Sequence, residues 1–421
     1  MREVAYLFER FPSFGQTFCY REVAELERQG TKLHVFSIRR PVNEPAQDWN
    51  KQIVENVHYL PEEKALVAEI DAALRRQPLS DSAHAVIQKW GRQTDFLRLY
   101  QALYVGRRLQ QAGLGHLHAH FAGMAARTAY WIKEFFEIPF SFTGHANDIF
   151  APRDFVVSLP KLMDSASAIV TVSDYAADFL ENRFPGSASR IHRIYNGVNL
   201  ARFHPTDFGS GTPAIVSIGR LIEKKGFADL IRACALLTAR RRDFVCEIIG
   251  EGPLEATLRT QIAEAGLEGI VRLTGPQTQA EIALRLAHAT IFVLPCTHEE
   301  GGGMDNLPTV IMEAMAAGLP VISTPVAGVP EMVGPDVNGE LVPEHDPVAI
   351  CAALERLISD PVRARRLGDR GRQIALEKFS IEGSAQQLRQ LFARISCSDV
   401  ATGIPARNSL PGDKPGAGRP A

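Results

Sequence analysis

Two short segments in the second half of the chain carry residue types suited to holding a pyrophosphate. The first is SIGRLIEKKG (217–226), in which Arg220 and Lys225 follow an apolar run typical of a buried strand. Arg offers a bidentate fork to phosphate oxygens and Lys offers a point charge. Ligands of open α/β sheets bind beyond the carboxyl ends of the strands, so we expect these cations to face a ligand. A solvated basic turn is the alternative interpretation.

The second segment is EEGGGMDNLP (299–308), which an apolar helical pattern follows. Its glycines would let backbone N–H groups approach a ligand closely, and a helix N-terminus favours anions. We expect Asn306 to be the N-cap of this helix and Pro308 to lie in its first turn.

Two acids in and after this segment are candidates for the two ends of an extended ligand. Asp305 and Glu313 are eight positions apart, which is about 12 Å along a helix at about 1.5 Å per residue. Glu313 interrupts an otherwise apolar helix, and a buried charge needs a partner or a ligand.

The elements that must position these residues form an alternating pattern. Short apolar, β-branched runs alternate with helical patterns of 10–17 residues, which predicts parallel sheets covered by helices on both faces. With 421 residues and 46.3 kDa, the chain is long enough for two domains. We predict an N-terminal domain over 1–195, a linker over 196–213, a C-terminal domain over 214–378 and a disordered tail over 397–421, each sheet having five or six strands.

Composition and missing motifs exclude several classes of function. The formal charge is -2, without the positive excess that nucleic-acid binding needs. No signal peptide or membrane span is indicated and the cysteines are scattered, so we expect a cytoplasmic protein. The nearest match to the dinucleotide fingerprint G-x-G-x-x-G is GEGPLE (250–255), whose last position is Glu, which argues against a dehydrogenase.

At these motifs the chain resembles a known family. GRLIEKKG, IGEGPLE and GGGMDNLPTVIMEAMAAG, together with FPSFGQTFCYREV and FTGHAND in the N-terminal half, resemble family 4 glycosyltransferases of the GT-B fold, especially bacterial exopolysaccharide members of the colanic-acid type. The resemblance covers residues 3 to about 396. It implies two Rossmann-like doubly wound lobes facing a cleft, with the acceptor on the N-terminal lobe, the donor on the C-terminal lobe and a helix over 379–396 crossing back. It also implies sugar transfer with retention, without a metal or other cofactor, from a UDP- or GDP-linked sugar to a glycan or lipid-linked acceptor.

The resemblance also implies roles for single residues. Arg220 and Lys225 would neutralise the donor diphosphate, Glu313 would contact the ribose, and Asp305 would lie near the donor sugar, where an Asp replaces the usual Glu. His145, at the end of a strand beside Gly144, would face the donor sugar or phosphate. Further donor-binding positions would be Gly219, Gly252, Gly302, Gly303, Met304, Asn306 and Leu307. The acceptor-side loop would include Ser13, Gly15 and Gln16, and it departs from the usual Ser-Glu-Thr form, so an acidic contact there would be lost.

Four alternatives stay open at this point. His116, His118 and His120 alternate on one strand face and could bind a metal, although a structural role is favoured. The aromatic and basic segment 89–108 could contact a membrane peripherally, although a core-facing stripe is favoured. The chain could also be a non-catalytic nucleotide-sugar-binding subunit of a polysaccharide assembly complex, which the Asp at 305 encourages. Finally, it could be another GT-B enzyme, an epimerase or a phosphorylase.

Overall fold

The computed structural model describes residues 3–90, 95–151, 154–205 and 211–401, and they form two lobes, each built on a parallel sheet. The N-terminal lobe holds a seven-stranded sheet of order β3-β2-β1-β4-β5-β6-β7. Its strands are β1 (Val4–Arg10), β2 (Leu33–Arg39), β3 (His58–Tyr59), β4 (Leu117–His120), β5 (Phe140–Gly144), β6 (Ala168–Thr171) and β7 (Ile191–Arg193). All neighbouring pairs are parallel.

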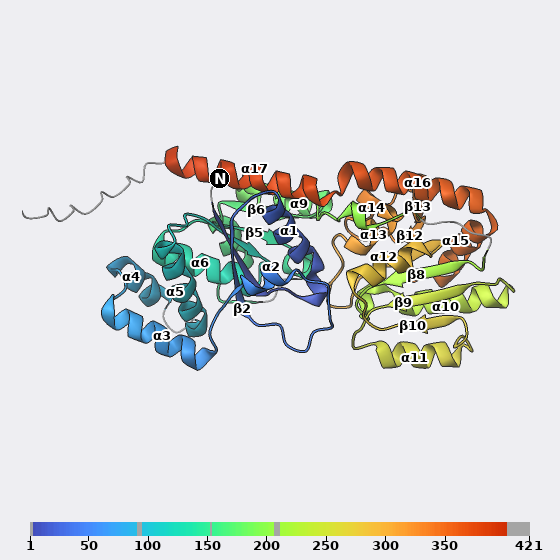
Figure 1. The fold of residues 1–421 in the computed structure, drawn as a ribbon, viewed down its shortest axis with the longest axis horizontal. Helices are drawn as coiled ribbons and strands as arrows, with labels where there is room; N and C mark the ends of the chain where they lie inside the picture. Colours follow the sequence, from blue (N-terminus) through green and yellow to red (C-terminus); the bar gives the residue numbers. More distant parts are fainter. Residues whose placement is uncertain (1–2, 91–94, 152–153, 206–210, 402–421) are drawn as a thin grey trace, which may run out of the picture.

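Helices cover both faces of this sheet (Figure 1). They are α1 (Thr17–Arg28), α2 (Lys51–Glu55), α3 (Glu63–Arg76), α4 (Asp81–Trp90), α5 (Phe96–Gln111), α6 (Met124–Phe136), α7 (Ala146–Phe150), α8 (Leu159–Ser165) and α9 (Asp174–Arg183). One core packs α5 and α6 against the central strands, and a second core lies on the opposite face around Tyr6 and Phe8. Burial on both faces explains why these strands are near-continuous apolar runs.

The C-terminal lobe repeats this architecture with a six-stranded sheet of order β10-β9-β8-β11-β12-β13. Its strands are β8 (Ala214–Ile218), β9 (Val245–Ile249), β10 (Val271–Leu273), β11 (Ile291–Leu294), β12 (Val321–Ser323) and β13 (Gly339–Leu341). Its helices are α10 (Phe227–Ala239), α11 (Glu255–Glu264), α12 (Gln279–Ala287), α13 (Thr309–Ala316), α14 (Val329–Met332), α15 (Pro347–Ser359) and α16 (Pro361–Lys378).

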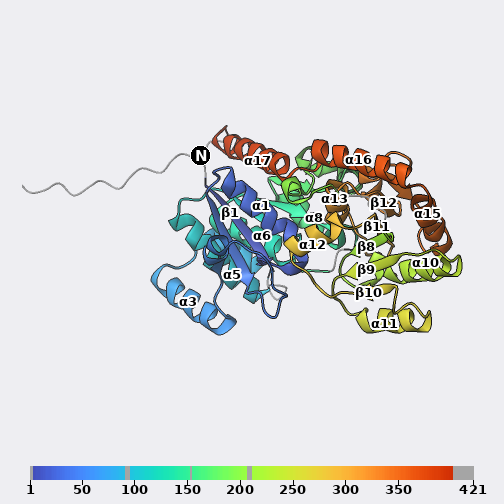
Figure 2. The ribbon, with the colours of Figure 1, turned by 45° about the vertical axis from the view of Figure 1, so that its right-hand side comes forward.

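The last helix, α17 (Ile381–Ala401), leaves the C-terminal lobe and lies on the N-terminal one, as Figures 1 and 2 both show. Its side chains Leu388 and Phe392 belong to the core around Tyr6. Where the chain crosses, Val198 N donates to Phe379 O at 2.9 Å and Ile381 N donates to Val198 O at 3.0 Å. The two chain crossings between the lobes are therefore hydrogen-bonded to each other.

The α/β architecture with two doubly wound lobes is confirmed, and several finer expectations were wrong. The C-terminal sheet has six strands, within the expected five or six, but the N-terminal sheet has seven. The expectation fell short there because β3 and β7 are too short to stand out as apolar runs. Helix α17 runs beyond the predicted boundary at 396 into the segment expected to be disordered, and residues 402–421 lie outside the described part. Part of the predicted linker, 206–210, also lies outside it.

The aromatic and basic segment 89–108 is two helices, α4 and α5, rather than one, and its residues 91–94 are not described. Tyr104 is buried in the lobe core under the guanidinium of Arg108, and Arg107 donates to the backbone of Gln77. Phe96 instead is 63% exposed. Apart from Phe96, these contacts follow the pattern of a core-facing stripe.

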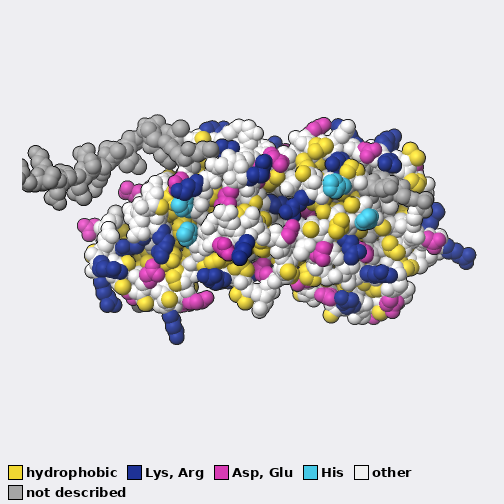
Figure 3. All heavy atoms as spheres, in the orientation of Figure 1, with side chains coloured by type: hydrophobic (Ala, Val, Ile, Leu, Met, Phe, Trp, Pro, Cys, Tyr) yellow, Lys and Arg dark blue, Asp and Glu magenta, His cyan; other side chains and the backbone are white. Residues whose placement is uncertain are grey.

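The surface and the helices give two further observations. On the face that Figure 3 shows, basic and acidic side chains are interspersed rather than gathered in one field. Within the described ranges, no helix is both long enough and apolar enough to cross a bilayer.

Candidate functional site at the lobe interface

The loop that follows β8 brings two lysines onto Asp305. A short 3-10 helix, Glu223–Lys225, ends at Gly226, whose φ of +67° favours glycine. A Cβ at Gly226 would lie 1.8 Å from Pro295 O, so the turn packs directly on the end of β11. The Lys225 ammonium lies 2.5 Å from Asp305 Oδ2, and that of Lys224 lies 3.5 Å from Asp305 Oδ1. These side chains are 12–13% exposed, so the cluster is a nearly buried ion pair with an additional cation.

Electrostatics keep this cluster charged. Burial alone would raise the pKa of Asp305, but Lys225 and Lys224 outweigh it, and the pKa lies below its usual value. Burial likewise acts to lower the pKa of Lys225, and the negative charge of Asp305 reverses the shift, so the pKa is raised. Two lysines against one carboxylate leave a net positive charge at the end of β8, which suits an anion.

Arg220 is open to solvent, whereas Gly219 and Gly252 are explained by packing. Arg220 is exposed beside this cluster and has no ion pair among the described residues, so it is accessible to a ligand. A Cβ at Gly219 would lie 3.2 Å from the Lys225 side chain, so Gly219 leaves the space that this lysine needs. A Cβ at Gly252 would lie 2.5 Å from Leu221 O, which explains Gly252 by packing of two loops.

The loop before α13 is partly exposed and partly buried. Gly302 has a φ of +75° and is exposed. A Cβ at Gly303 would lie 2.2 Å from Glu299 Oε2. Met304 and Leu307 belong to the lobe core. Asn306 is not the predicted N-cap, because the helix begins at Thr309 with Pro308 in extended backbone as its N-cap.

Asn306 instead joins the two lobes. Its Oδ1 accepts a hydrogen bond of 2.5 Å from Ser173 Oγ, which caps α9 in the N-terminal lobe. Its Nδ2 is buried without a hydrogen-bond partner among the described residues. Beside it Glu331 of α14 accepts the backbone N–H groups of Asp174 and Tyr175 at 2.9 Å, so the C-terminal lobe supplies an anion at the start of α9.

Glu313 is buried on α13, and its partner comes from the N-terminal lobe. Arg21 Nη1 of α1 donates to Glu313 Oε1 at 2.6 Å, and both side chains are at most 7% exposed. Nε and Nη2 of Arg21 are buried without partners in the described part of the chain. The expectation that a charge in this apolar helix needs a partner or ligand is met by Arg21, and Oε2 of Glu313 makes no hydrogen bond within the described residues.

His145 follows β5 and lies near the lysine cluster. It precedes α7, and Asn147 in that helix accepts a hydrogen bond of 3.3 Å from the Lys224 ammonium across the lobe interface. The imidazole is buried against Phe18 and Phe121, with ring centroids 4.9 and 4.5 Å away. Burial, and next the charge of His120, hold the pKa of His145 well below its ordinary value, so the ring is neutral at pH 7.

The loop of Ser13, Gly15 and Gln16, which the resemblance assigned to the acceptor side, does hold an acidic contact, although the acid comes from elsewhere in the chain. Ser13 Oγ donates to Glu44 Oε1 at 3.1 Å, and the backbone N–H of Phe14 donates to the same carboxylate. Gly15 is exposed with open space around it, and Gln16 N donates to Ser13 O at 3.0 Å. Glu44 therefore places a carboxylate at the loop where the local sequence lacks one.

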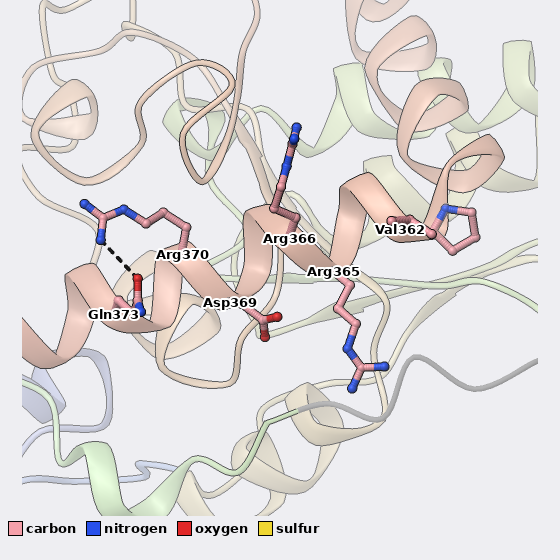
Figure 4. A pocket seen from close by; sticks show the side chains of 7 residues that line it. Val362, Arg365, Arg366, Asp369, Arg370 and Gln373 are labelled. Carbon is pink, nitrogen blue, oxygen red and sulfur yellow. Dashed lines mark hydrogen bonds between the residues drawn. The ribbon is translucent and has the colours of Figure 1, made fainter.

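A wide hollow on the surface lies away from this interface. It measures about 610 Å³ and follows α16, from which Arg365, Arg366 and Arg370 extend in different directions in Figure 4. All its lining residues come from that single helix, so it brings together no groups from different elements.

Two family models match consecutive parts of the chain. Residues 15–202 match the model described as Glycosyltransferase Family 4, and residues 202–374 match the one described as glycosyl transferases group 1. The chain belongs to the family 4 glycosyltransferases. This membership confirms the resemblance predicted from the motifs, and the junction of the two matches falls in the crossing between the lobes.

Related proteins include AmsK of Erwinia amylovora, an amylovoran biosynthesis glycosyltransferase, which is 46% identical over 143 residues, 34% of this chain and 35% of AmsK. WcaL of Escherichia coli, described as a colanic acid biosynthesis glycosyltransferase, is 40% identical over 39% of this chain and 42% of its own length. A GDP-mannose-dependent mannosyltransferase of Mycolicibacterium smegmatis is 31% identical over 56% and 64%, respectively. In each case the match spans less than two thirds of the relative.

Solved structures show the same fold for this family 4 glycosyltransferase. A glycosyltransferase from Rickettsia africae superposes with a TM-score of 0.71 at 16% identity, covering 94% of this chain and 99% of the other. Anabaena HepE in complex with UDP and glucose superposes with a TM-score of 0.69 at 18% identity, covering 93% and 100%.

The sequence motifs missed several residues at this interface. Lys224 lay in the basic segment without an assigned role, Arg21 lay in the motif FPSFGQTFCYREV, which supported only the resemblance, and Ser173 had no assigned role. The sequence did indicate that Glu313 needs a partner such as Arg21, because a buried carboxylate requires a cation. No local sequence pattern, however, identifies which basic residue provides it.

Proposed function

We propose that this protein is a retaining glycosyltransferase that moves a sugar from a UDP- or GDP-linked donor to a glycan or lipid-linked acceptor in exopolysaccharide or other cell-surface polysaccharide biosynthesis. Family membership and the names of AmsK and WcaL support this proposal. The GDP-mannose-dependent relative and the UDP complex of HepE support the two candidate nucleotides. A lipid-linked acceptor would bring the protein to the cytoplasmic face of a membrane, where the exposed Phe96 is a candidate contact.

The observation that carries the proposal is the lysine cluster at the lobe interface. Lys225 and Lys224 share one carboxylate, and Lys224 reaches Asn147 of the opposite lobe. A diphosphate beside Arg220 would meet positive charge that is already held in place. Such preorganised charge stabilises the negative charge that grows on the leaving group.

The family resemblance suggests the course of the reaction. The bond from the anomeric carbon to the donor phosphate breaks, and its electron pair leaves with the diphosphate. The acceptor oxygen forms the new bond to that carbon, and its proton passes to the leaving phosphate on the same face of the sugar. In this mechanism Lys225 and Arg220 neutralise the leaving group, and Asp305 holds the Lys225 ammonium in position.

Nucleotide binding tests the donor assignment. We expect either UDP or GDP, and not ADP, to raise the melting temperature, because a ligand that binds only the folded state adds RT ln(1 + [L]/Kd), about 2.7 kcal/mol at a 100-fold excess over Kd. Transfer assays with the matching nucleotide sugars and lipid-linked glycans then follow, with the anomeric configuration of the product read by NMR. Nucleotide binding without transfer to any acceptor would favour a binding subunit, and an inverted product would contradict retention.

Metal independence is a separate expectation, because lysines and an arginine supply the positive charge at the proposed diphosphate site. Turnover should survive dialysis against EDTA with a change of less than about 2-fold, whereas loss of an essential electrostatic group costs about 100-fold or more. Activity that disappears with the chelator and returns with Mg²⁺ or Mn²⁺ would contradict it.

A further inference from the structure

A chain of hydrogen bonds runs from His145 to a carboxylate on α1. His145 Nε2 lies 3.3 Å from His120 Nδ1, and His120 Nε2 lies 2.9 Å from Glu22 Oε1. The same oxygen of Glu22 accepts a hydrogen bond of 2.8 Å from the Tyr6 hydroxyl. These hydrogen bonds therefore link the end of β5, through the end of β4, to the first helix of the lobe.

Packing fixes the planes of the two imidazole rings. The rings of His120 and His145 are stacked, with centroids 5.6 Å apart and an interplanar angle of 16°. Phe8 stacks on the other side of His120 at 5.0 Å and 13°. Neither ring can turn away from the other without disturbing the core of the sheet face.

The charges of the surrounding groups determine which ring nitrogens in this chain of hydrogen bonds carry protons. Burial acts to lower the pKa of His120, but its neighbours Cys19 and Glu22 outweigh it, so the pKa is raised. Burial raises the pKa of the Cys19 thiol, so the negative charge beside His120 near pH 7 is the Glu22 carboxylate at 2.9 Å. His118, the other titratable ring beside His120 at 5.3 Å, has its pKa lowered mainly by burial and is neutral.

A protonated His120 has two N–H donors and no acceptor. One donates to Glu22. The other, on Nδ1, lies 3.3 Å from Nε2 of His145 and 3.6 Å from Sγ of Cys19, and because sulfur is a weak acceptor the hydrogen bond goes to the ring nitrogen of His145. The proton of the neutral His145 therefore lies on Nδ1. Among the described residues, Nδ1 of His145 has no hydrogen-bond partner, so this N–H is the one available to a ligand.

We propose that Glu22 and His120 are positioning residues that fix the tautomer of His145, so that its Nδ1–H is presented to the donor sugar or phosphate. This inference rests on the proposed function, in which His145 faces the donor. It also explains why His120, one of the alternating histidines, lies at the end of β4 beside an acid.

The same surroundings admit a competing explanation, a metal site. One ligand atom each of Glu22, His118 and His120 lie within 4.8 Å of one another. However, the two ring nitrogens of His118 lie 2.8 and 3.0 Å from Ser141 Oγ and Thr143 Oγ1, so both already have hydrogen-bond partners. The hydrogen-bond chain accounts for the ring nitrogens of His120 as well, which favours positioning over metal binding.

The test compares Glu22→Gln with the unaltered protein. Gln keeps the size and an acceptor oxygen but removes the charge, so His120 loses its proton near neutral pH and no longer constrains His145. We expect kcat to fall by about 10-fold with little change in the donor KM. A 10-fold loss is at the low end of the range expected when a group that orients a ligand-binding histidine is removed. We also expect kcat of the unaltered protein to stay flat from about pH 6 to 9, and that of the variant to fall within this range.

Two further readouts separate positioning from mere structural support. Nitrogen-15 NMR of the histidines should show the proton of His145 on Nδ1 in the unaltered protein and on a mixture of both nitrogens in Glu22→Gln. His120→Gln, which retains an N–H donor, should keep more activity than His120→Ala. His116→Gln, one residue before β4 and outside the chain of hydrogen bonds from His145 to Glu22, is the control and should leave the pH profile unchanged.

An unchanged tautomer and an unchanged pH profile in Glu22→Gln would overturn the inference. So would one equivalent of bound transition metal whose removal lowers activity. Failure of the proposed function would give a different result. In that case His145→Ala would keep the full kcat, or no donor would be turned over. The NMR experiment would still report the tautomer of His145.

Discussion

Replacing Lys225 by Ala lowers kcat/KM for the nucleotide-sugar donor by about 100-fold or more, on the scale of losing one preorganised electrostatic group. The ammonium lies 2.5 Å from Asp305 and belongs to the net positive cluster at the end of β8. Steady-state kinetics with the donor identified by thermal shift measure the effect. Lys64→Ala, on the exposed face of α3, is the matched control and should leave kcat/KM unchanged.

Stability changes too, because the Lys225 side chain is only 13% exposed and is not part of a solvated basic turn. Removing Lys225 leaves a buried Asp305 with Lys224 alone, so the loss should be smaller than the about 3–5 kcal/mol for one partner of a fully buried pair. Asp305→Ala in the Lys225→Ala background should restore stability without restoring transfer. Near-normal kcat/KM with a large loss of melting temperature would show that Lys225 is structural only.

Replacing Arg21 by Met lowers the free energy of unfolding by about 3 kcal/mol or more, because Glu313 is left as a buried carboxylate without its cation. Replacing both at once, Arg21→Met with Glu313→Leu, should come close to the stability of the unaltered protein, since no charge then remains in the apolar surroundings. Urea denaturation of the two single variants and the double variant measures the coupling between them.

The control for this cycle is an ion pair whose two partners are exposed. Arg259 pairs with Glu255 on α11, and the side chains are 56% and 40% exposed, so Arg259→Met should change stability by less than about 1 kcal/mol. Nucleotide affinity provides a second readout, because Glu313→Gln should weaken UDP or GDP binding if Oε2 accepts a ribose hydroxyl. A double variant that is no more stable than the single variants would contradict the assignment of this pair as a buried ion pair.

Local sequence patterns were sufficient to predict most strands of the two sheets. Strands such as β8 and β11 are apolar because both of their faces are covered, and this produces runs that stand out from the amphipathic helices between them. Strands β3 and β13 have two and three residues, too few for a pattern, and they are defined by pairing with a neighbour instead. The start of α13 was misplaced because Asn306 has the right side chain for an N-cap but is engaged by Ser173 of the other lobe.

The site was predictable in its residue types but not in its pairings. The spacing of Lys225 and Asp305 around strand ends indicated that both would reach one edge of the sheet. Arg21 and Glu313 are separated by 292 positions, and no local pattern reports a contact at that distance. The same limit applies to Glu44, which supplies an acid to a loop that lacks one in its own sequence.

The hydrogen-bonded pair of chain crossings at Val198 and Phe379–Ile381 restricts how the lobes can move. A single connection would let one lobe swivel freely about it, whereas two connections that lie together permit little more than rotation about one axis through them. Gly197 belongs to this point, because a Cβ there would lie 2.3 Å from Ile381 Cα. In the proposed function, opening for substrate exchange would then be a rotation about this one axis, and the lysine cluster and His145 would return to the same relative position when the lobes close.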